Sequence, residues 1–168
     1  QDYTWLAITA KAAGFADGAL DEVRVWSDVP DSRFGARPQQ DIVANMSRML
    51  QEGVERKIFT SQKAEEILSR VTGTTDLAAA AEADLVIEAV FEDKGVKSDL
   101  FKKLDAVCSE KTILATNTSS FYVREFAAQT RRPDRFIGLH YFYHPAKNRL
   151  LEVIPHEGTS RETVEKSL

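Results

Sequence analysis

From about Val71 onward, short apolar runs alternate with longer segments in which apolar residues recur every three or four positions. This alternation of strand-like and helix-like patterns is typical of βαβ units around a parallel sheet. The clearest strand is ADLVIEAV at 83–90, whose nearly continuous apolar character suits a strand covered on both faces. The same reasoning predicts strands at 112–116, 135–140 and 149–154.

Helical patterns separate and precede these strands. Helices are predicted at 38–55, 61–70 and 121–130. Pro38 suits the first turn of its helix, and Gly53 is expected to mark the end of the same helix. In KGVKSDLFKKLDAVC the apolar side chains fall on one side of a helix, at Val96, Leu100, Phe101, Leu104, Val107 and Cys108.

The pattern is less regular toward the two ends of the chain. Residues 5–17 have a helical pattern, VRVW at 23–26 predicts a strand, and the segment 27–38 is a loop rich in Pro, Gly, Asp and Ser. Near the other end, Thr159 and Glu162 have the spacing of a capping box, which predicts the start of a last helix. Together these elements predict an α/β fold in a single domain.

Length and charge narrow the classes of function. The chain has 168 residues and a net charge of −4. This slight acidity argues against a nucleic-acid or anionic-membrane partner, which would need clustered Lys and Arg. No segment approaches the roughly 20 apolar residues of a membrane span. The single cysteine, Cys108, excludes a disulfide framework and a Cys-rich metal site, and it favours a reducing compartment such as the cytoplasm.

Polar residues at the strand ends are the first candidates for chemistry, because ligands of open α/β sheets bind outside the carboxyl ends of the strands. Glu92 follows the strand at 83–90, and His140 ends the strand at 135–140. Asn117 and Ser119 follow the strand between them. Since parallel neighbours point the same way, Asn117, Ser119 and His140 are expected at one edge of the sheet.

Glu152 is a further candidate, because it interrupts the apolar run LLEVI. A buried carboxylate there would need a partner. Paired with His140, it would fix the imidazole tautomer and raise its basicity, as a general base or acid requires. Two plainer interpretations stay open: Glu152 could face water on an edge strand, and His140 could be structural.

Three motifs in this order resemble one family. The segment LVIEAVFEDKGVKSDLFKKLDAVCSEKTILATNTSSF, followed by RRPDRFIGLHYF and RLLEVI, is similar to the NAD-binding domain of 3-hydroxyacyl-CoA dehydrogenases. Ser119 lies 21 residues before His140, which lies 12 residues before Glu152. The resemblance covers about residues 61–168, whereas residues 1–60 match poorly.

The resemblance implies a Rossmann-like parallel sheet with helices on both faces, and NAD as the cofactor. It implies that His140 exchanges a proton with the substrate 3-hydroxyl while hydride moves between C3 and the nicotinamide. Glu152 would then steady the imidazolium, and Ser119 would hydrogen-bond the substrate oxygen. Glu92 and Lys97 match positions that contact the cofactor around its ribose and carboxamide, and Asn117 is a weaker match of the same kind.

Structural roles for these residues stay open beside the functional ones. Ser119 could cap the helix that follows it, and Glu92 could cap the helix that begins after it. Lys97 lies on the polar side of its predicted helix and could be a solvated charge. Asn117 could shape only its turn. Gly138 is interpreted as a packing residue within its strand.

The expected opening of a dinucleotide-binding domain is not intact. Such a domain begins with a strand, a GxGxxG turn and a second strand that ends in an acidic residue. The chain has no GxGxxG. With VRVWSD as the second strand, Ser27 or Asp28 would read the ribose and the phosphate turn would fall near 4–9, where TWLAIT would obstruct the pyrophosphate. The N-terminal strand and glycine turn are therefore missing or degenerate, and we expect weak or no NAD binding by residues 1–168.

The resemblance implies NAD-dependent oxidation of L-3-hydroxyacyl-CoA to 3-oxoacyl-CoA, with an acyl-CoA substrate and a homodimer of the full-length protein. Residues 1–168 are expected to be a single, incomplete dinucleotide-binding domain without the family's helical C-terminal domain. Two alternatives stay open: a catalytically silent module of a multifunctional protein, and a dehydrogenase for a non-CoA hydroxy acid. The aromatic segment YFYHP after His140 keeps the second alternative open.

Overall fold

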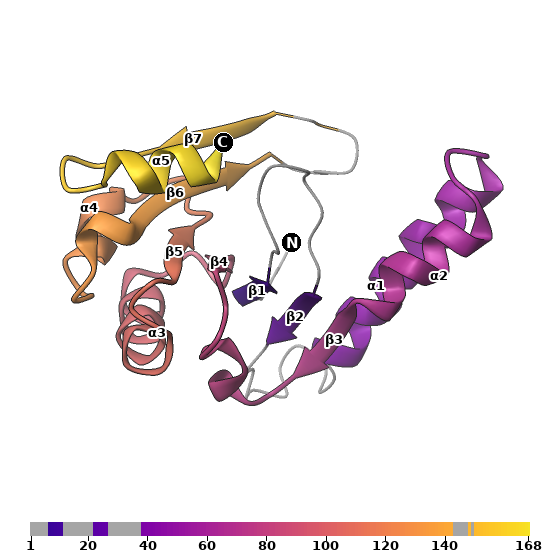
Figure 1. Cartoon of the computed structure of the whole chain (residues 1–168), viewed down its shortest axis with the longest axis horizontal. Coiled ribbons are helices and arrows are strands. Elements are labelled where there is room, and N and C mark those ends of the chain that lie inside the picture. The colour runs from indigo at the N-terminus through magenta and orange to yellow at the C-terminus, as the bar shows by residue number, and fades with distance from the viewer. Residues whose placement is uncertain (1–6, 12–21, 27–37, 143–147, 149) are drawn as a thin grey trace.

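The computed structural model describes residues 7–11, 22–26, 38–142, 148 and 150–168. Within these residues the strands form one seven-stranded sheet in the order β3-β2-β1-β4-β5-β6-β7 (Figure 1). Strands β2 and β3 are parallel, as are β4, β5 and β6, whereas β1 and β7 run antiparallel to their neighbours. The strands are β1 (Ala7–Lys11), β2 (Glu22–Trp26), β3 (Val71–Thr74), β4 (Leu85–Glu88), β5 (Ile113–Thr116), β6 (Phe136–Tyr141) and β7 (Leu151–Ile154).

Helices connect the parallel strands, as the sequence predicts. The side chains of Thr60, Asp93 and Ser160 accept hydrogen bonds from backbone N–H groups in the first turns of three of these helices, which satisfies donors that the helix itself cannot. The described helices are α1 (Pro38–Glu55), α2 (Ser61–Ser69), α3 (Lys94–Val107), α4 (Val123–Ala127) and α5 (Arg161–Ser167), with short 3-10 helices η3 (Leu77–Ala80) and η4 (Pro133–Arg135).

Helices cover both faces of the sheet, so the predicted fold class is confirmed. On one face α3 and α4 pack onto β4, β5 and β6, and the fully buried Phe101 meets Phe136 with ring centroids 4.7 Å apart. Burying an aromatic side chain of this kind stabilises the fold by about 1.5–3 kcal/mol. On the other face Met46 of α1 packs near Val25, and Val164 of α5 packs against the ends of β5 to β7.

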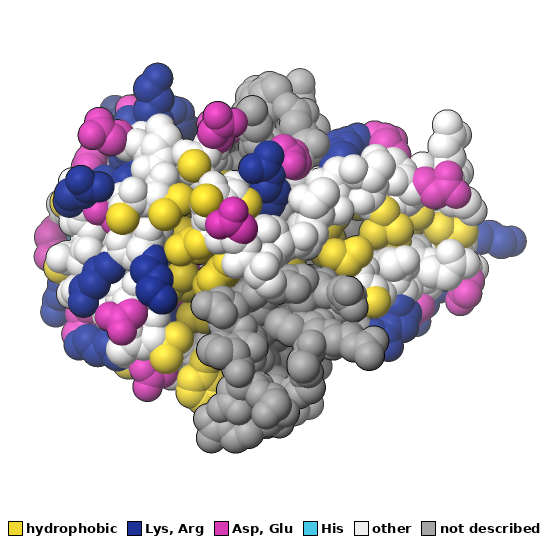
Figure 2. All heavy atoms as spheres, turned by 90° about the horizontal axis from the view of Figure 1, so that it is seen from below, with side chains coloured by type: hydrophobic (Ala, Val, Ile, Leu, Met, Phe, Trp, Pro, Cys, Tyr) yellow, Lys and Arg dark blue, Asp and Glu magenta, His cyan; other side chains and the backbone are white. Residues whose placement is uncertain are grey.

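The helices α1 and α2 form a hairpin that extends away from the sheet (Figure 1). On the face seen in Figure 2, hydrophobic side chains follow this hairpin, while Lys, Arg, Asp and Glu side chains are intermixed over the half that holds α3. Ile58, in the connection between α1 and α2, is 70% exposed. The intermixed charges mean that this face carries no large surface of one sign.

The helix predicted at 5–17 is wrong for residues 7–11, which form β1. This strand lies between β2 and β4 and pairs with both of them. Backbone hydrogen bonds on two sides hold these residues extended, and such pairing outweighs the helical pattern of a short segment.

Strand β1 occupies the central position of the first strand in a dinucleotide-binding sheet, but it runs in the opposite direction. Ala7 pairs with Trp26 and with Glu88, at the carboxyl ends of β2 and β4. The strand therefore begins at the ligand-binding edge and ends, at Lys11, at the opposite edge. The degenerate opening predicted from the sequence takes this form: a strand is present, and its direction is reversed.

Two predicted helix ends need correction. Gly53 does not end α1 but lies within its last turn, where a Cβ atom would come within 2.4 Å of the Phe59 ring, so close packing explains the glycine. The last helix is capped by Ser160 rather than by Thr159, whose hydroxyl instead donates to the Phe136 carbonyl at 2.8 Å.

Candidate functional site

The candidate residues gather at the edge of the sheet where the parallel strands β4, β5 and β6 end, which we call the rim. The side chain of Asn117, just after β5, accepts a hydrogen bond from the backbone N–H of Tyr141 at 2.7 Å. This bond ties the end of β5 to the end of β6. Because Tyr141 directly follows His140, the bond places Asn117 and His140 at the same edge of the sheet, as the strand directions predict.

His140 and Glu152 form a hydrogen-bonded pair. The two residues lie directly opposite each other on β6 and β7, and Nδ1 of His140 is 2.7 Å from Oε2 of Glu152. In this register Gly138 pairs with Ile154, and its position would place a Cβ against Val123 of α4. Since side chains alternate along a strand, His140 and Glu152 share the face that α4 covers.

Two features of this pair differ from the prediction. The strands β6 and β7 are antiparallel rather than parallel, because the connection at 142–150 is shorter than the dozen or so residues that a parallel crossover needs. Glu152 is not buried: β7 is an edge strand, and the Glu152 side chain is 50% exposed against 19% for His140. The plainer interpretation of Glu152 as an edge residue is therefore correct for its position, although it does pair with the histidine.

Glu92 binds the turn that follows β5 through several hydrogen bonds. Its Oε1 accepts hydrogen bonds from the backbone N–H groups of Ser119 and Ser120, both at 3.2 Å, and from the Thr118 hydroxyl. The Thr118 hydroxyl oxygen in turn accepts from the N–H of Phe121 at 3.1 Å. Glu92 therefore fixes the backbone that carries Ser119.

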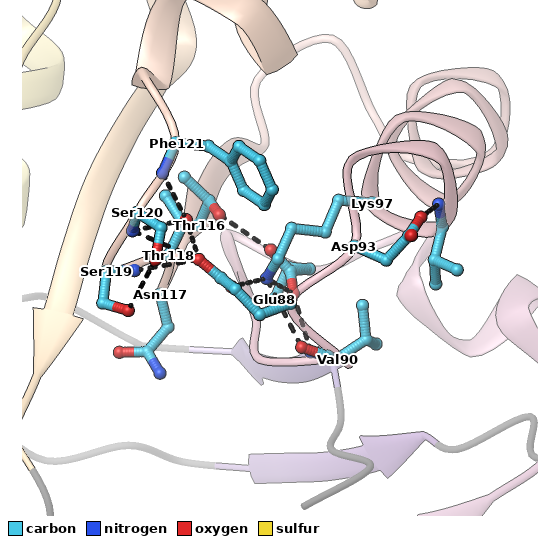
Figure 3. Close-up of polar contacts among 12 residues, drawn as sticks. Glu88, Val90, Asp93, Lys97, Thr116, Asn117, Thr118, Ser119, Ser120 and Phe121 are labelled. Carbon is cyan, nitrogen blue, oxygen red and sulfur yellow. Dashed lines mark hydrogen bonds and ion pairs between the residues drawn. The ribbon is translucent and has the colours of Figure 1, made fainter.

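Lys97 is fully buried, so the interpretation as a solvated charge is wrong. Its side chain is 1% exposed, and its Nζ lies 2.7 Å from Glu88 (Figure 3) and 3.0 Å from Glu92. A third, longer contact of 3.4 Å reaches the Val90 carbonyl. The helical pattern did not reveal this burial, because Lys97 reaches back from the first turn of α3 across the end of β4.

The two capping roles considered for Glu92 and Ser119 are also not found. Asp93, not Glu92, is the N-cap residue of α3, and its carboxylate accepts a hydrogen bond from the Val96 N–H. The N-cap residue of α4 is Tyr122, without a side-chain capping bond. The Ser119 hydroxyl lies 3.3 Å from that of Ser120.

Glu88 is a site residue that the sequence interpretation missed. Its side chain is completely buried, and its two oxygens accept from Lys97 at 2.7 Å, from the Thr116 hydroxyl at 2.7 Å and from the Val90 N–H at 2.6 Å (Figure 3). The signal that could have found it is the one that marked Glu152, an acidic residue within an apolar strand. The run LVIEAV carries this signal at Glu88 just as LLEVI carries it at Glu152.

The electrostatics of the rim favour an ionised Glu92. Burial on its own would raise the pKa of Glu92, but hydrogen bonds from Thr118 and Lys97 and the Lys97 charge outweigh burial and hold that pKa below its ordinary value. Away from the rim, burial raises the pKa of the Cys108 thiol to about 11, so this cysteine is a protonated, unreactive thiol at neutral pH.

The described residues suit one half of a dinucleotide. An ionised carboxylate with one-third of its side chain exposed, Glu92, can accept hydrogen bonds from ribose hydroxyls, and it already accepts one from the Ser119 N–H. The residues expected to read the adenosine ribose, Ser27 or Asp28, lie outside the described residues. Of the expected phosphate turn at 4–9, residues 7–9 lie in β1, which runs the wrong way to place a turn after it at the rim.

The arrangement can move a proton. A carboxylate only accepts hydrogen bonds, so Glu152 fixes the proton of a neutral His140 on Nδ1 and leaves Nε2 as a base. In the described part of the chain, no group of three His, Cys, Asp or Glu side chains is arranged to hold a metal ion. None of the described helices has the length and apolar character needed to cross a bilayer.

Comparisons with known proteins point to one family. A family model described as 3-hydroxyacyl-CoA dehydrogenase, NAD binding domain, matches residues 33–168. The 3-hydroxybutyryl-CoA dehydrogenase of Clostridioides difficile is 44% identical over 119 residues, which are 71% of this chain and 41% of that protein. The fatty acid oxidation complex subunit alpha of Shewanella amazonensis is 42% identical over 117 residues, which are 70% of this chain and 17% of that protein. The chain thus spans less than half the length of these curated relatives.

A solved structure agrees with this result. The crystal structure of 3-hydroxybutyryl-CoA dehydrogenase from Escherichia coli K12 superposes with a TM-score of 0.78 at 34% identity, covering 86% of this chain and 29% of that one. The segment before residue 33, which contains β1 and β2, lies outside the range of the family model.

Proposed function

Since the chain belongs to the 3-hydroxyacyl-CoA dehydrogenase family, through that family's NAD-binding domain, we propose that the protein oxidises L-3-hydroxyacyl-CoA to 3-oxoacyl-CoA. The observation that carries the proposal is the His140–Glu152 pair, held at 2.7 Å at the rim, where the next residue, Tyr141, donates its N–H to Asn117. NAD, when bound, supplies the acceptor for the hydride that leaves C3 of the substrate. We also expect, from the family resemblance, a homodimer of the full-length protein and a cytoplasmic location.

In this proposal His140 is the general base. Its Nε2 takes the proton from the substrate 3-hydroxyl in the oxidation and returns it in the reduction. Glu152 stabilises the imidazolium that forms, because its carboxylate already holds Nδ1–H. Ser119 donates its hydroxyl hydrogen to the substrate oxygen and keeps it aligned with His140.

The cofactor contacts are proposed on the same basis. Glu92 accepts from the ribose on the nicotinamide side. Lys97 matches a cofactor-contact position of the family but is 1% exposed, so its effect on the cofactor is exerted through its 3.0 Å ion pair with Glu92. Asn117 has its oxygen engaged by Tyr141, so its amide NH₂ group is the part that would face the cofactor. Asp28 is proposed to contact the adenosine ribose.

The test is reduction of acetoacetyl-CoA, followed as loss of NADH absorbance in protein expressed from the complete coding sequence. His140→Gln is expected to lower kcat about a hundredfold or more, the range typical of a lost general acid–base group. The matched control is His156→Gln, since His156 bonds the Pro133 carbonyl and the Gly158 N–H and has no part in the proposed site. Near-normal turnover of His140→Gln would reject the proposal, and an inactive wild-type protein would favour the silent module.

A further inference from the structure

A continuous set of contacts leads from the interior of the sheet to the rim. It begins at Glu88 on β4, passes through the Lys97 ammonium (Figure 3) and reaches Glu92, which accepts hydrogen bonds from the backbone N–H groups of Ser119 and Ser120. Glu88 and Lys97 are 0% and 1% exposed, whereas Glu92 is 33% exposed. Only the last member of the set is open to a ligand.

Packing alone gives no reason for Glu88. A buried ion pair is costly to desolvate, and well-packed apolar residues of similar volume often stabilise a fold as well or better. Three donors nevertheless bond this carboxylate: the Lys97 ammonium, the Thr116 hydroxyl and the Val90 N–H lie within 2.7 Å. The fully bonded Glu88 carboxylate fixes the Lys97 ammonium at one place, and that place is 3.0 Å from Glu92.

We propose that Glu88 is a positioning residue of the rim: it anchors Lys97, which holds Glu92 against the turn that carries Ser119. The proposal rests on the proposed function for its kinetic consequence, because Glu92 and Ser119 are the groups that would meet cofactor and substrate. Glu88 itself touches neither. Its effect is transmitted through Lys97 and Glu92.

Replacing Glu88 by glutamine tests this chain of contacts. The amide keeps the size of the side chain but removes its charge, so Glu92 becomes the nearest anionic partner of Lys97 and is drawn away from the N–H groups of Ser119 and Ser120. In protein expressed from the complete coding sequence, we expect Glu88→Gln to raise KM for NADH about tenfold, with a smaller change in kcat. In a Glu92→Gln background the same substitution should change KM less than about twofold, because the two residues act in series.

The matched control is Asp105→Asn, which breaks another buried ion pair, with Arg132, away from the rim. It should lower thermal stability and leave KM for NADH unchanged. A Glu88→Gln protein that behaves in the same way, or that adds its full effect to that of Glu92→Gln, would overturn the proposal, because Glu88 would then be only structural.

A second measurement does not depend on turnover. Amide hydrogen exchange of residues 118–121 should be about tenfold faster in Glu88→Gln, with no matching change in β5, and unchanged in Asp105→Asn. Equal exchange in Glu88→Gln and wild type would refute the anchoring role. If Glu88→Gln does not fold, Thr116→Val removes one hydrogen bond to Glu88 and should show a smaller change of the same kind. An inactive wild-type protein would refute the proposed function, while the exchange result would still decide the role of Glu88.

Discussion

At the scale of single residues, the His140 imidazole is prepared for proton transfer by one contact. The 2.7 Å bond to Glu152 assigns the two ring nitrogens different tasks, since Nδ1 is committed and Nε2 is the remaining base. The pair is partly open to water, so its contribution to folding is small, and in the proposed reaction its value lies in orienting the imidazole and stabilising its charge.

Glu152→Gln should therefore slow catalysis with little effect on stability. A charge-assisted hydrogen bond contributes about 1.5–3 kcal/mol, and its loss in the transition state corresponds to roughly a 10- to 100-fold fall in kcat. The measurement is acetoacetyl-CoA reduction at saturating NADH, with Glu157→Gln, an exposed carboxylate outside the proposed site, as the control. A variant with unchanged kcat would show that the carboxylate is dispensable.

Asp105 offers a residue-level test of stability against pH. Burial would raise the pKa of Asp105, but hydrogen bonds from Arg131 and Arg132 outweigh burial and hold that pKa below its ordinary value. A group whose pKa is lowered by folding stabilises the fold above its unfolded pKa, about 3.9, and this stability is lost as the pH falls through the folded pKa. Asp105→Asn should cost about 3 kcal/mol at neutral pH. The difference from wild type in urea unfolding should shrink below about pH 4, and a constant difference would contradict the assignment.

The sequence identified residues at the rim by their type and place but could not give their surroundings. His140, Glu152 and Asn117 were found because each stands at a strand end or interrupts an apolar run. The burial of Lys97 was not predictable, because it depends on a carboxylate that arrives from another strand. Glu88 could have been found, because it is an acidic residue within an apolar strand, and the structure shows that it is a buried carboxylate bonded to Lys97.

At the scale of elements, the sequence predicted correctly those helices and strands that are stabilised by their own residues. The helix predicted at 38–55 has those limits in the structure, because Pro38 and the apolar side of the helix define it. The strand β1 was missed because its extended form depends on pairing on two sides, and one partner, β4, begins more than 70 residues further along the chain. The direction of β7 was missed because it depends on the length of a connection, a feature that the apolar pattern does not contain.

Gly138 tests how closely β6 and β7 pack next to the His140–Glu152 pair. An added Cβ would lie 2.9 Å from Cγ2 of Val123 and 3.0 Å from Cβ of Ile154, so Gly138→Ala must push α4 or β7 outward. Overpacking of this kind costs about 1–3 kcal/mol, measurable by urea unfolding. As the control, Gly95→Ala in the first turn of α3 meets only the Asp93 carboxylate at 3.2 Å and should change stability by less than about 0.5 kcal/mol. Equal stabilities of the two variants would show that β7 moves outward without a measurable loss in the free energy of unfolding.

At the scale of the whole molecule, the sheet joins strands inside the range of the family model to strands outside it. The range 33–168 contains β3 to β7 and every described residue of the proposed site, whereas β1 and β2 lie before it. Strand β1 completes the sheet between β2 and β4 but is reversed. Folding requires only that the central position be filled, whereas pyrophosphate binding requires a strand that leads into a glycine turn at the rim.

This difference predicts the affinity of residues 1–168 for NAD. The nicotinamide half would meet Glu92 and Ser119, but the pyrophosphate would lack the N–H groups that a GxGxxG turn offers at the start of a helix. We expect a dissociation constant weaker than about 1 mM, equivalent to less than about 4 kcal/mol of binding free energy. Calorimetric titration of folded 1–168 with NADH measures it, and thermal unfolding of the same sample confirms that the sheet is formed. Micromolar affinity would mean that the reversed strand still presents a phosphate site, so that the direction of β1 does not decide cofactor binding.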